Sequence, residues 1–264
     1  MRSDFATLSV ERRGEHVLVV TLDRPEASNA MNTQMGHDLM GLLEGFALDV
    51  EGLRSVVLTG SGQKAFCAGG DLKERKGMTD EAWAAQHLVF ERMLRALVGC
   101  PIPVIAAVNG AAYGGGCEIA AACDFIYAAP HARFALTEVT LGIMPGAGGT
   151  QTLPRAVGER RAKEFILTGS PFTAHEAEAW GLVNRVIDAE ALLDAAIETA
   201  ERIAANAPIA IRQAKQSIHR GLQMSLSDGL AFEIEAYNRM VSTNDRHEGV
   251  LAFNEKRRPR FTGR

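Results

Sequence analysis

The stretch PVIAAVNGAAYGGGCEIAAACDFIYAAP, residues 103–130, decides the fold class. It opens with a β-branched, apolar strand pattern, and a second short strand pattern begins at residue 123. Between them stand three consecutive glycines and a short apolar helix pattern that carries Glu118. The apolar length approaches that of a membrane span, but Asn109 and Glu118 argue against one. A buried strand, a helix and another strand in succession indicate an α/β protein.

Strand and helix patterns alternate on both sides of this stretch. Short β-branched runs predict strands, and apolar residues at helical spacing predict helices. Capping residues support two of these helices, because Thr79 precedes one and Thr173 with Glu176 forms a capping box before the other. The predicted strands are 16–22, 54–60, 103–110, 123–130, 133–139 and 182–187, and the predicted helices outside the quoted stretch are 35–46, 80–99, 157–169 and 173–181.

The last quarter of the chain differs from the rest. From about residue 189 onward it shows helical patterns only, and Asp245 with Glu248 has the spacing of another capping box. No low-complexity linker and no fixed-period repeat divides the sequence. We therefore predict a spiral α/β catalytic core over residues 1–190 and a helical C-terminal oligomerisation region over residues 191–264.

The composition fits a globular protein with a sizeable core. Of the 264 residues 47% are hydrophobic, and 28 basic against 32 acidic side chains leave a net charge of −4. That balance gives no reason to expect nucleic acid or an anionic membrane as a partner. The four cysteines form no CxxC pair, and the first residues contain no apolar signal segment. We expect a cytoplasmic protein with reduced thiols.

Several motifs that would indicate other functions are absent or incomplete. GSGQKA, residues 60–65, matches a dinucleotide-binding fingerprint, but FCAGGD follows at once, so no helix is expected there. The chain has neither a P-loop motif nor the GxSxG of α/β-hydrolases. Its seven histidines are scattered without metal-ligand spacing. Cys67 and Cys117 have no base nearby in sequence, and we interpret them as small buried side chains.

Glycines stand directly after two of the predicted strands. FCAGGD occupies residues 66–71, and AYGGGCE occupies residues 112–118, where the glycines open a helix. Because glycine has no side chain, a ligand oxygen can approach the free N–H groups of a helix N-terminus closely. Two such N–H groups from different loops would form an oxyanion hole. Tight packing of the helix against a strand would favour the same glycines, and the residues alone leave both interpretations open.

Two glutamates stand in unusual surroundings. Glu118 lies within one turn of the glycines, where the helix N-terminus partly offsets the cost of burial. Glu138 lies in FALTEVTLGIMPGAGG, with no basic residue before Arg155, so we expect a raised pKa. Two carboxyl groups in different surroundings are suited to acid–base catalysis. The alternatives are a helix-start charge for Glu118 and a solvated strand end for Glu138.

Six segments, in this order, resemble the enoyl-CoA hydratase/isomerase, or crotonase, superfamily from about residue 10 to residue 262. They are LDRPEASNAMN, FCAGGDLKE, NGAAYGGGCEIAAACDF, LTEVTLGIMPGAGGTQTLPR, EAWGLVNRV and FNEKRRPRF. The resemblance implies an α/β fold, a crotonase-type spiral of β-β-α turns with a helical C-terminal trimerisation region. It also implies a homotrimer, or a hexamer built as a dimer of trimers.

The same resemblance implies an acyl-CoA thioester substrate whose carbonyl oxygen sits between the N–H groups of Gly70 and Gly115. The family's two catalytic glutamates fall on Glu118 and Glu138, and the presence of both favours a hydratase, because isomerases of the family commonly retain only the second. The residue at position 70 is often Ala in hydratases, and Gly keeps the N–H while leaving more room beside the acyl chain. No metal and no separate cofactor is expected, since CoA is part of the substrate.

The family's substrate-contacting positions fall on both ends of the chain. Two tail residues are expected to reach a ligand bound by a neighbouring subunit, and the others are expected to line the CoA moiety. The tail residues are Phe253 and Lys256, and the others are Arg24, Ala68, Asp71, Leu72 and Lys73.

Two further functions remain open within the same fold. In an isomerase, Glu138 alone would move a double bond. DLKERKGM, residues 71–78, also resembles methylglutaconyl-CoA hydratases, some of which bind RNA, although the negative net charge favours a solvated basic loop near the CoA phosphates. The sequence does not indicate the length or branching of the acyl chain.

Overall fold

Two β-sheets form the centre of the computed structural model, which describes residues 4–264. The larger sheet has six strands and the smaller has four. The strands are β1 Leu8–Arg13, β2 Val17–Leu22, β3 Ser55–Gly60, β4 Ala65–Cys67, β5 Val104–Val108, β6 Ala111–Tyr113, β7 Phe125–Ala128, β8 Arg133–Ala135, β9 Phe172–Thr173 and β10 Arg185–Val186.

Helices occupy most of the remaining chain. Two of them are short 3-10 helices, η1 Pro25–Ala27 and η2 Glu138–Leu141. The α-helices are α1 Thr33–Leu48, α2 Leu72–Arg75, α3 Asp80–Val98, α4 Gly115–Ala122, α5 Gly149–Val157, α6 Glu159–Thr168, α7 Ala174–Ala179, α8 Leu192–Ala204, α9 Pro208–Gly221, α10 Leu226–Val241 and α11 Asn244–Asn254.

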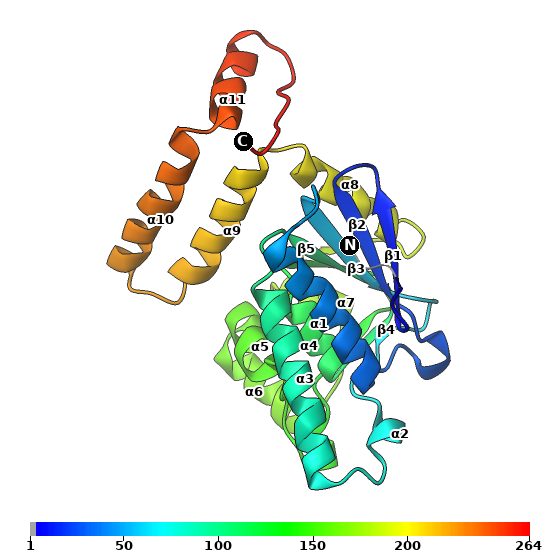
Figure 1. Cartoon of the computed structure of the whole chain (residues 1–264). Helices are drawn as coiled ribbons and strands as arrows, with labels where there is room; N and C mark the ends of the chain where they lie inside the picture. Colours follow the sequence, from blue (N-terminus) through cyan, green and yellow to red (C-terminus); the bar gives the residue numbers. More distant parts are fainter. Residues whose placement is uncertain (1–3) are drawn as a thin grey trace.

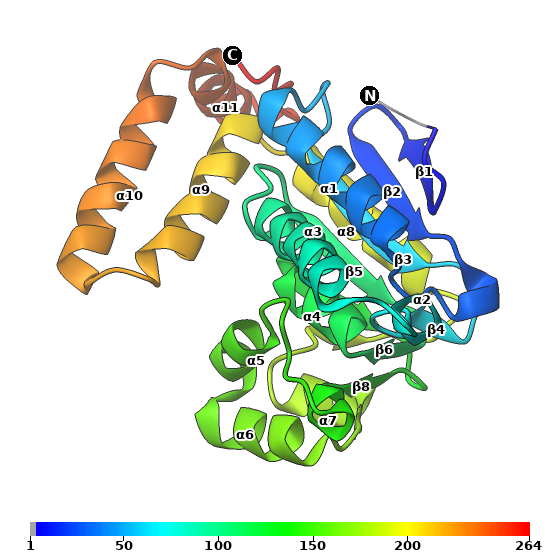
Figure 2. The same cartoon turned by 60° about the horizontal axis from the view of Figure 1, so that its bottom comes forward.

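From β3 to β8 successive strands alternate between the two sheets. The larger sheet has the order β1-β2-β3-β5-β7-β10, and the smaller has the order β4-β6-β8-β9. The chain therefore passes from β3 to β4, returns through α3 to β5, continues to β6, and returns through α4 to β7. The pairs β2–β3, β3–β5 and β5–β7 are all parallel. This repeated β-β-α turn is the predicted spiral, and Figures 1 and 2 show it from two directions.

Both faces of the larger sheet are buried. Leu18, Val20 and Leu22 of β2 belong to one core cluster, which also contains apolar side chains of α1, α3 and α4. Val17 and Val19, which point to the opposite face because successive strand side chains alternate, pack in a second cluster with α8. Figure 2 shows α1 and α3 over one face of the sheet and α8 on the other.

Two of the three predicted helix caps are present in the structure. The side chain of Thr79 accepts a hydrogen bond from the N–H of Ala82, and Thr173 with Glu176 forms the predicted capping box. The predicted box at Asp245 and Glu248 is wrong. Thr243 caps α11, the Asp245 carboxylate accepts hydrogen bonds from the N–H groups of residues 262 and 263, and Glu248 pairs with Arg257.

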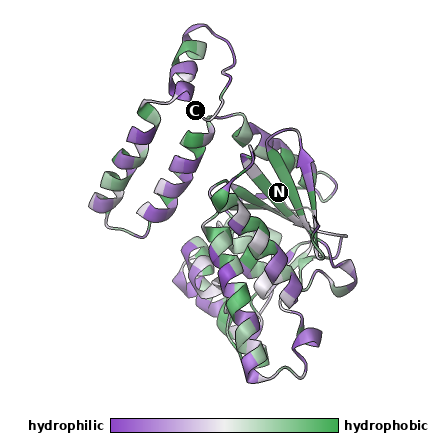
Figure 3. Ribbon diagram, in the orientation of Figure 1, coloured by the Kyte–Doolittle hydropathy of each residue, from purple (hydrophilic) through white to green (hydrophobic). Residues whose placement is uncertain are grey.

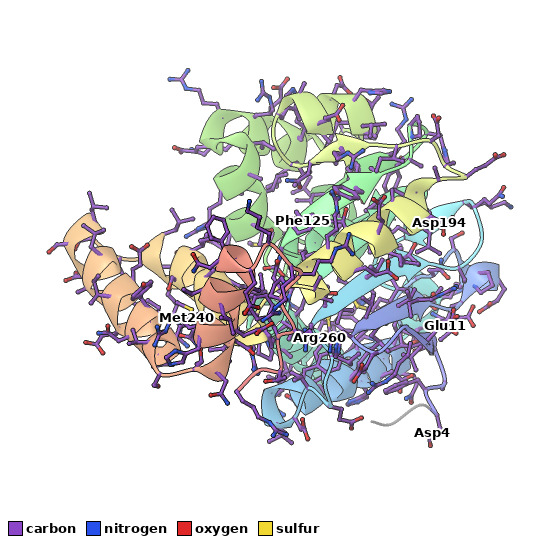
Figure 4. The ribbon with its side chains drawn as sticks, turned by 90° about the horizontal axis from the view of Figure 1, so that it is seen from above. Asp4, Glu11, Phe125, Asp194, Met240 and Arg260 are labelled. Atoms are coloured by element: carbon purple, nitrogen blue, oxygen red, sulfur yellow. The ribbon has the colours of Figure 1, made fainter. Side chains whose placement is uncertain are left out.

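Helices α9, α10 and α11 form an arm that extends away from the sheets (Figure 1). In Figure 4 the labelled Met240 of α10 and Asp194 of α8 lie on opposite sides of the view. Helix α8 falls within residues 191–264 but packs on the sheet, and the division of the chain at residue 190 stays a prediction. No helix among residues 4–264 is long and apolar enough to cross a membrane.

The arm carries many exposed apolar side chains. Figure 3 shows hydrophobic segments interspersed along the arm helices. Those with more than half of their surface exposed are Ile218, Leu222, Leu226, Leu230, Ile234, Tyr237, Val250, Leu251 and Phe253. Exposed apolar side chains gathered on one part of a molecule are typical of interfaces between proteins.

Candidate active site

A cavity of about 530 Å³ lies where α2, α3, α4 and η2 meet. Its volume is in the range of pockets that bind small organic ligands. Apolar side chains such as Met31, Trp83 and Phe90 line much of it. Glu118 and Glu138 also line the cavity, together with both predicted N–H donors. The fold therefore brings together the four residues that the sequence singled out for chemistry.

The N–H group of Gly70 is available to a ligand because of an isolated bridge between two loops. Met31 pairs with Gly70 in parallel register. The N–H of Met31 donates to the carbonyl of Gly69 at 2.7 Å, and the N–H of Asp71 donates to the carbonyl of Met31 at 3.0 Å. These two hydrogen bonds engage the carbonyl of Gly69 and the N–H of Asp71, the residues on either side of Gly70. Among residues 4–264 the N–H of Gly70 itself donates to no backbone carbonyl.

The N–H group of Gly115 is free for a different reason. Gly115 is the first residue of α4, so its N–H has no acceptor inside the helix. A Cβ atom on Gly115 would lie 3.9 Å from the nitrogen of Gly70, so the two backbone segments are neighbours on the cavity wall. The prediction that the glycines open a helix is confirmed.

Packing and ligand access both account for the three glycines. Gly114 has a φ of 51°, a conformation that favours glycine. A Cβ on Gly116 would lie 2.1 Å from the carbonyl oxygen of Cys67, which is far inside the contact distance. The two interpretations of this motif are therefore compatible, because the close packing of α4 against β4 is what carries Gly115 to Gly70.

Glu118 is held by a loop that the sequence did not single out. Its side chain is only 3% exposed, and its Oε1 atom accepts hydrogen bonds of 2.8 Å from the N–H groups of Ala147 and Gly149. Burial raises the pKa of Glu118 to about 7, and the charge of Glu138 adds to that rise, while the two N–H groups oppose it. Glu118 thus lies in the first turn of α4, and it is a buried, oriented carboxyl group.

Glu138 begins η2 and is buried, so its alternative interpretation as a solvated strand end is wrong. Its side chain is buried, and its Oε2 atom has no hydrogen-bond partner among residues 4–264. Burial raises the pKa of Glu138, as expected, although the nearby positive charge of Arg75 opposes the rise. The absence of basic residues along the sequence was therefore a poor guide, because Arg75 approaches from α2.

Arg75 was missed by the sequence analysis as a site residue. It belongs to the segment KERK, residues 73–76, which we expected to be a solvated basic loop. Lys73 and Lys76 are exposed, but the side chain of Arg75 turns inward and lines the cavity. Its guanidinium carbon lies 4.3 Å from the ring centre of Trp83. The helical spacing of Trp83 and Phe90 on α3 marked that face as apolar, but no local pattern indicated that a cation would lie on it.

Only some of the predicted CoA-contacting residues of the core line the cavity. Ala68 and Leu72 line the cavity, and Lys73 is exposed near it. Arg24 and Asp71 make an ion pair of 3.0 Å with each other. The Asp71 carboxylate also caps α2, and the hydrogen bonds from Arg24 and from the N–H groups at the start of α2 lower the pKa of this group despite its partial burial. This pair connects the loop after β2 to the start of α2, and a direct contact of either side chain with CoA stays a prediction.

The two tail residues do not reach the cavity of their own chain. Phe253 is 83% exposed on the arm, and Lys256 follows α11. Figures 1 and 2 place α11 at the opposite end of the molecule from α2. Their predicted role, which requires a second subunit, is neither confirmed nor contradicted by a single chain.

The thiols and the glycine-rich turn behave as interpreted. Cys67 and Cys117 are fully buried, and burial raises the pKa of both thiols, that of Cys67 to about 11. All four cysteines are free. Residues 61–64 form a bend that leads into β4, so GSGQKA opens no helix.

Two buried carboxyl groups and two free N–H groups thus face one cavity. N–H pairs of this kind stabilise an oxyanion that develops from a carbonyl group, and carboxyl groups with raised pKa values exchange protons near neutral pH. The class of protein defined by fold and site is an α/β enzyme that performs acid–base chemistry next to a polarised carbonyl.

Comparison with known proteins identifies the family. Residues 12–264 match the sequence profile of the enoyl-CoA hydratase/isomerase family. A short-chain-enoyl-CoA hydratase of Clostridium acetobutylicum is 43% identical over 94% of this chain and 95% of that protein. A 2,3-dehydroadipyl-CoA hydratase of Escherichia coli is 42% identical over 96% of this chain and 97% of that protein.

Solved structures of related proteins have the same fold. The crystal structure of an enoyl-CoA hydratase from Bacillus anthracis superposes with a TM-score of 0.95 at 45% identity, covering 98% of this chain and all of that one. The chain belongs to the enoyl-CoA hydratase/isomerase family, and its spiral is the fold of that family.

Proposed function

We propose that this enzyme adds water to a 2-enoyl-CoA thioester and produces a 3-hydroxyacyl-CoA. The observation that carries the proposal is the pair of buried carboxyl groups, Glu118 and Glu138, facing one cavity beside the N–H groups of Gly70 and Gly115. Addition of water needs one group to accept a proton from water and another to give a proton to carbon. A single carboxyl group would be sufficient for moving a double bond.

The thioester carbonyl oxygen would accept hydrogen bonds from the N–H groups of Gly70 and Gly115. Negative charge moves onto this oxygen as water adds, so both hydrogen bonds strengthen in the transition state. Removal of one such donor typically costs about 10²–10³-fold in turnover.

The two glutamates would divide the proton transfers. Glu118, oriented by Ala147 and Gly149, takes a proton from the water whose oxygen bonds to C3 of the substrate. Glu138, whose Oε2 atom has no partner among residues 4–264, delivers its proton to C2. The cycle ends when the proton held by Glu118 is lost and Glu138 is protonated again. No group other than these side chains is required to carry a proton or an electron.

Assembly forms part of the proposal. The exposed apolar surface of α9, α10 and α11 would be buried between subunits of a homotrimer or a hexamer. Phe253 and Lys256 would then reach the CoA moiety bound by a neighbouring chain. Light scattering is expected to give the mass of three or six chains, and an active monomer would contradict this part.

The hydratase proposal is tested by replacing each glutamate. Glu118→Gln and Glu138→Gln keep the shape of the side chain and remove its acid–base function, so each should lower the rate of hydration about 10²–10⁴-fold. Glu164→Gln, on the exposed surface of α6, serves as the matched control and should retain full activity.

Product analysis separates hydration from isomerisation. Each protein is supplied with a 2-enoyl-CoA and with a 3-enoyl-CoA of the same length. We expect 3-hydroxyacyl-CoA from the unaltered enzyme and very little from either glutamate variant. If the unaltered enzyme forms no hydroxyacyl product, and Glu118→Gln still converts the 3-enoyl to the 2-enoyl thioester, the protein is an isomerase.

A further inference from the structure

A positive charge projects into the otherwise apolar part of the cavity. Arg75 lies against the rings of Trp83 and Phe90, with its guanidinium carbon 4.3 and 5.7 Å from their centres. The other charged residues that line the cavity are Glu118 and Glu138, to which the proposed chemistry already assigns roles. A straight-chain apolar acyl group gains nothing from a cation in this place, and the half-buried guanidinium group loses part of its hydration.

A buried amide fixes the orientation of this arginine. The Nε atom of Arg75 donates to Oε1 of Gln86 at 2.8 Å, and the Nε2 atom of Gln86 donates to Glu74 at 2.7 Å and to Thr33 at 2.8 Å. Gln86 is only 3% exposed. Because both ends of its amide are engaged, Gln86 cannot rotate without losing these bonds, and it holds the Nε edge of the guanidinium away from the cavity.

The terminal nitrogens of Arg75 are left free. Among residues 4–264 neither Nη1 nor Nη2 makes a hydrogen bond, and no carboxylate lies within ion-pair distance of them, although the charges of Glu74 and Glu138 act on the guanidinium group. Glu74 is the nearest candidate on the same helix, but its carboxylate is occupied by the N–H of Thr33 and by Gln86. The two free nitrogens form a planar fork, which is the arrangement that binds a carboxylate through two parallel hydrogen bonds.

Gly70 provides the space for this fork. A Cβ atom at position 70 would lie 3.1 Å from both Cζ and Nη1 of Arg75, which is tighter than almost all real contacts. The room that glycine leaves beside the acyl chain is therefore filled by the guanidinium group. Its position also places the fork a short distance from the N–H of Gly70, and hence from the thioester end of the substrate.

We infer that the natural substrate carries a second carboxylate, at the far end of a short acyl chain, and that Nη1 and Nη2 of Arg75 bind it. This inference rests on the proposed hydratase function and specifies its substrate class, the mono-CoA thioester of an unsaturated dicarboxylic acid. Gln86 is a positioning residue in this arrangement, because it acts through Arg75.

The test compares matched substrates. Glutaconyl-CoA has five acyl carbons and a terminal carboxylate, and 2-pentenoyl-CoA has five acyl carbons and none. We expect the unaltered enzyme to favour glutaconyl-CoA in kcat/KM, and Arg75→Met to lower the ratio of the two kcat/KM values about 10–100-fold, the range of a charged hydrogen bond. Arg75→Lys, which keeps the charge without the fork, should lower it less. Arg92→Met, on the exposed face of α3, removes the same charge and should leave the ratio unchanged.

Two results would overturn the inference while leaving the hydratase proposal intact. One is equal kcat/KM for both substrates in the unaltered enzyme, with no change of the ratio in Arg75→Met. The other is a parallel loss on both substrates, which would mean that Arg75 serves Glu138 instead of a substrate carboxylate.

A binding measurement makes the test independent of turnover. The saturated pair, glutaryl-CoA and pentanoyl-CoA, is titrated into each protein by calorimetry. The inference requires tighter binding of glutaryl-CoA, by a factor that falls about 10–100-fold in Arg75→Met. If neither enoyl-CoA is hydrated but this preference is present, the hydratase proposal fails and the carboxylate site stands. If the preference is absent, the carboxylate site is rejected whatever the reaction.

Discussion

The surroundings of Glu118 and of Glu138 differ although both face one cavity. Glu118 accepts two N–H groups from residues 147 and 149, on the loop before α5 and at its first turn. Glu138 has an Oε2 atom without any partner among residues 4–264 and a cation, Arg75, in its neighbourhood. The Glu118 carboxyl is fixed by two N–H groups of another loop, whereas that of Glu138 interacts only with its own backbone N–H and leaves Oε2 without a partner among the described residues.

This difference shows how one cavity can support two proton transfers in opposite directions. Hydrogen bonds from backbone N–H groups favour the ionised form of a carboxyl group, whereas a buried oxygen without a donor favours the protonated form. The geometry therefore matches Glu118 to accepting a proton from water and Glu138 to giving one to carbon. Because the two groups interact, their titration belongs to the pair and not to either residue alone.

The strongest test of this division is the double variant Glu118→Gln/Glu138→Gln. If the two carboxyl groups act in a single step, the double variant should be little worse than either single one, with a loss of about 10²–10⁴-fold in kcat. Single-turnover measurements with 2-enoyl-CoA would detect the residual rate. Losses that multiply would show that the two groups act independently and that the comparison is misleading.

The loop that holds Glu118 can be disturbed without touching the carboxylate. A Cβ atom on Gly149 would lie 3.0 Å from Oε1 of Glu118, so Gly149→Ala should displace it. We expect kcat for hydration to fall about 10²-fold, as is typical when a reacting group is misplaced by about 1 Å. The control is Gly41→Ala on α1, where an added Cβ meets nothing within 4 Å. Unchanged kcat in Gly149→Ala would show that the loop does not orient Glu118.

The dependence of kcat/KM on pH should reflect both carboxyl groups. Burial raises the pKa of Glu118 to about 7 and also raises that of Glu138. Ionised Glu118 and protonated Glu138 are needed together, so the profile should be bell-shaped, with roughly a tenfold loss per pH unit on its acidic side. Initial rates between pH 5 and pH 9 would show this. A flat profile across that range is incompatible with the proposed division.

The stability of the protein should fall as pH rises through the range in which ionisation of Glu118 increases activity. The pKa of Glu118 rises from 4.5 to about 7 on folding, so the folded protein binds more protons between these pH values. Its stability therefore falls as pH rises through this window, and the full penalty is present above pH 7. Glu118→Gln removes the penalty while its amide oxygen can still accept both N–H groups.

We expect this variant to be more stable than the unaltered protein at pH 8, by at most about 3 kcal/mol or a few degrees in Tm. The gain should disappear near pH 4.5, where Glu118 is half protonated even when unfolded. Thermal melts at both pH values, with Glu164→Gln as the control, would check this. A gain of the same size at both pH values would point to packing instead of charge.

Much of the fold was predictable because its signals are local. The strands of the larger sheet from β2 to β7 are apolar and β-branched, and the caps of α3 and α7 lie within three residues of their partners. Three short strands, β4, β6 and β9, were missed, whereas the equally short β8 and β10 lie within the predicted strands 133–139 and 182–187. Strand β1, with the sequence LSVERR, is an exposed edge strand whose alternation is too polar to recognise.

All four residues of the candidate site were named from the sequence, but their proximity was predictable only where a glycine and a glutamate share a motif. Gly115 and Glu118 belong to one helix start, so their proximity followed from the sequence. The donors to Glu118 come from a loop after η2, and Arg75 reaches Glu138 from a different helix. The tertiary fold alone creates these contacts. For the same reason the spacing of Asp245 and Glu248 was misread, because the partners of Asp245 lie near the end of the chain.

The three consecutive glycines differ in how easily each can be replaced by another residue during evolution. Position 114 is restricted by its backbone conformation, and position 116 by the carbonyl of Cys67 at 2.1 Å from any added Cβ. At position 115 the one tight contact of an added Cβ would be with the methyl end of the Met31 side chain, at 3.0 Å, and that end can move. Descendants of this gene should therefore keep glycine at 114 and 116 and accept alanine first at 115, the position whose N–H faces the cavity.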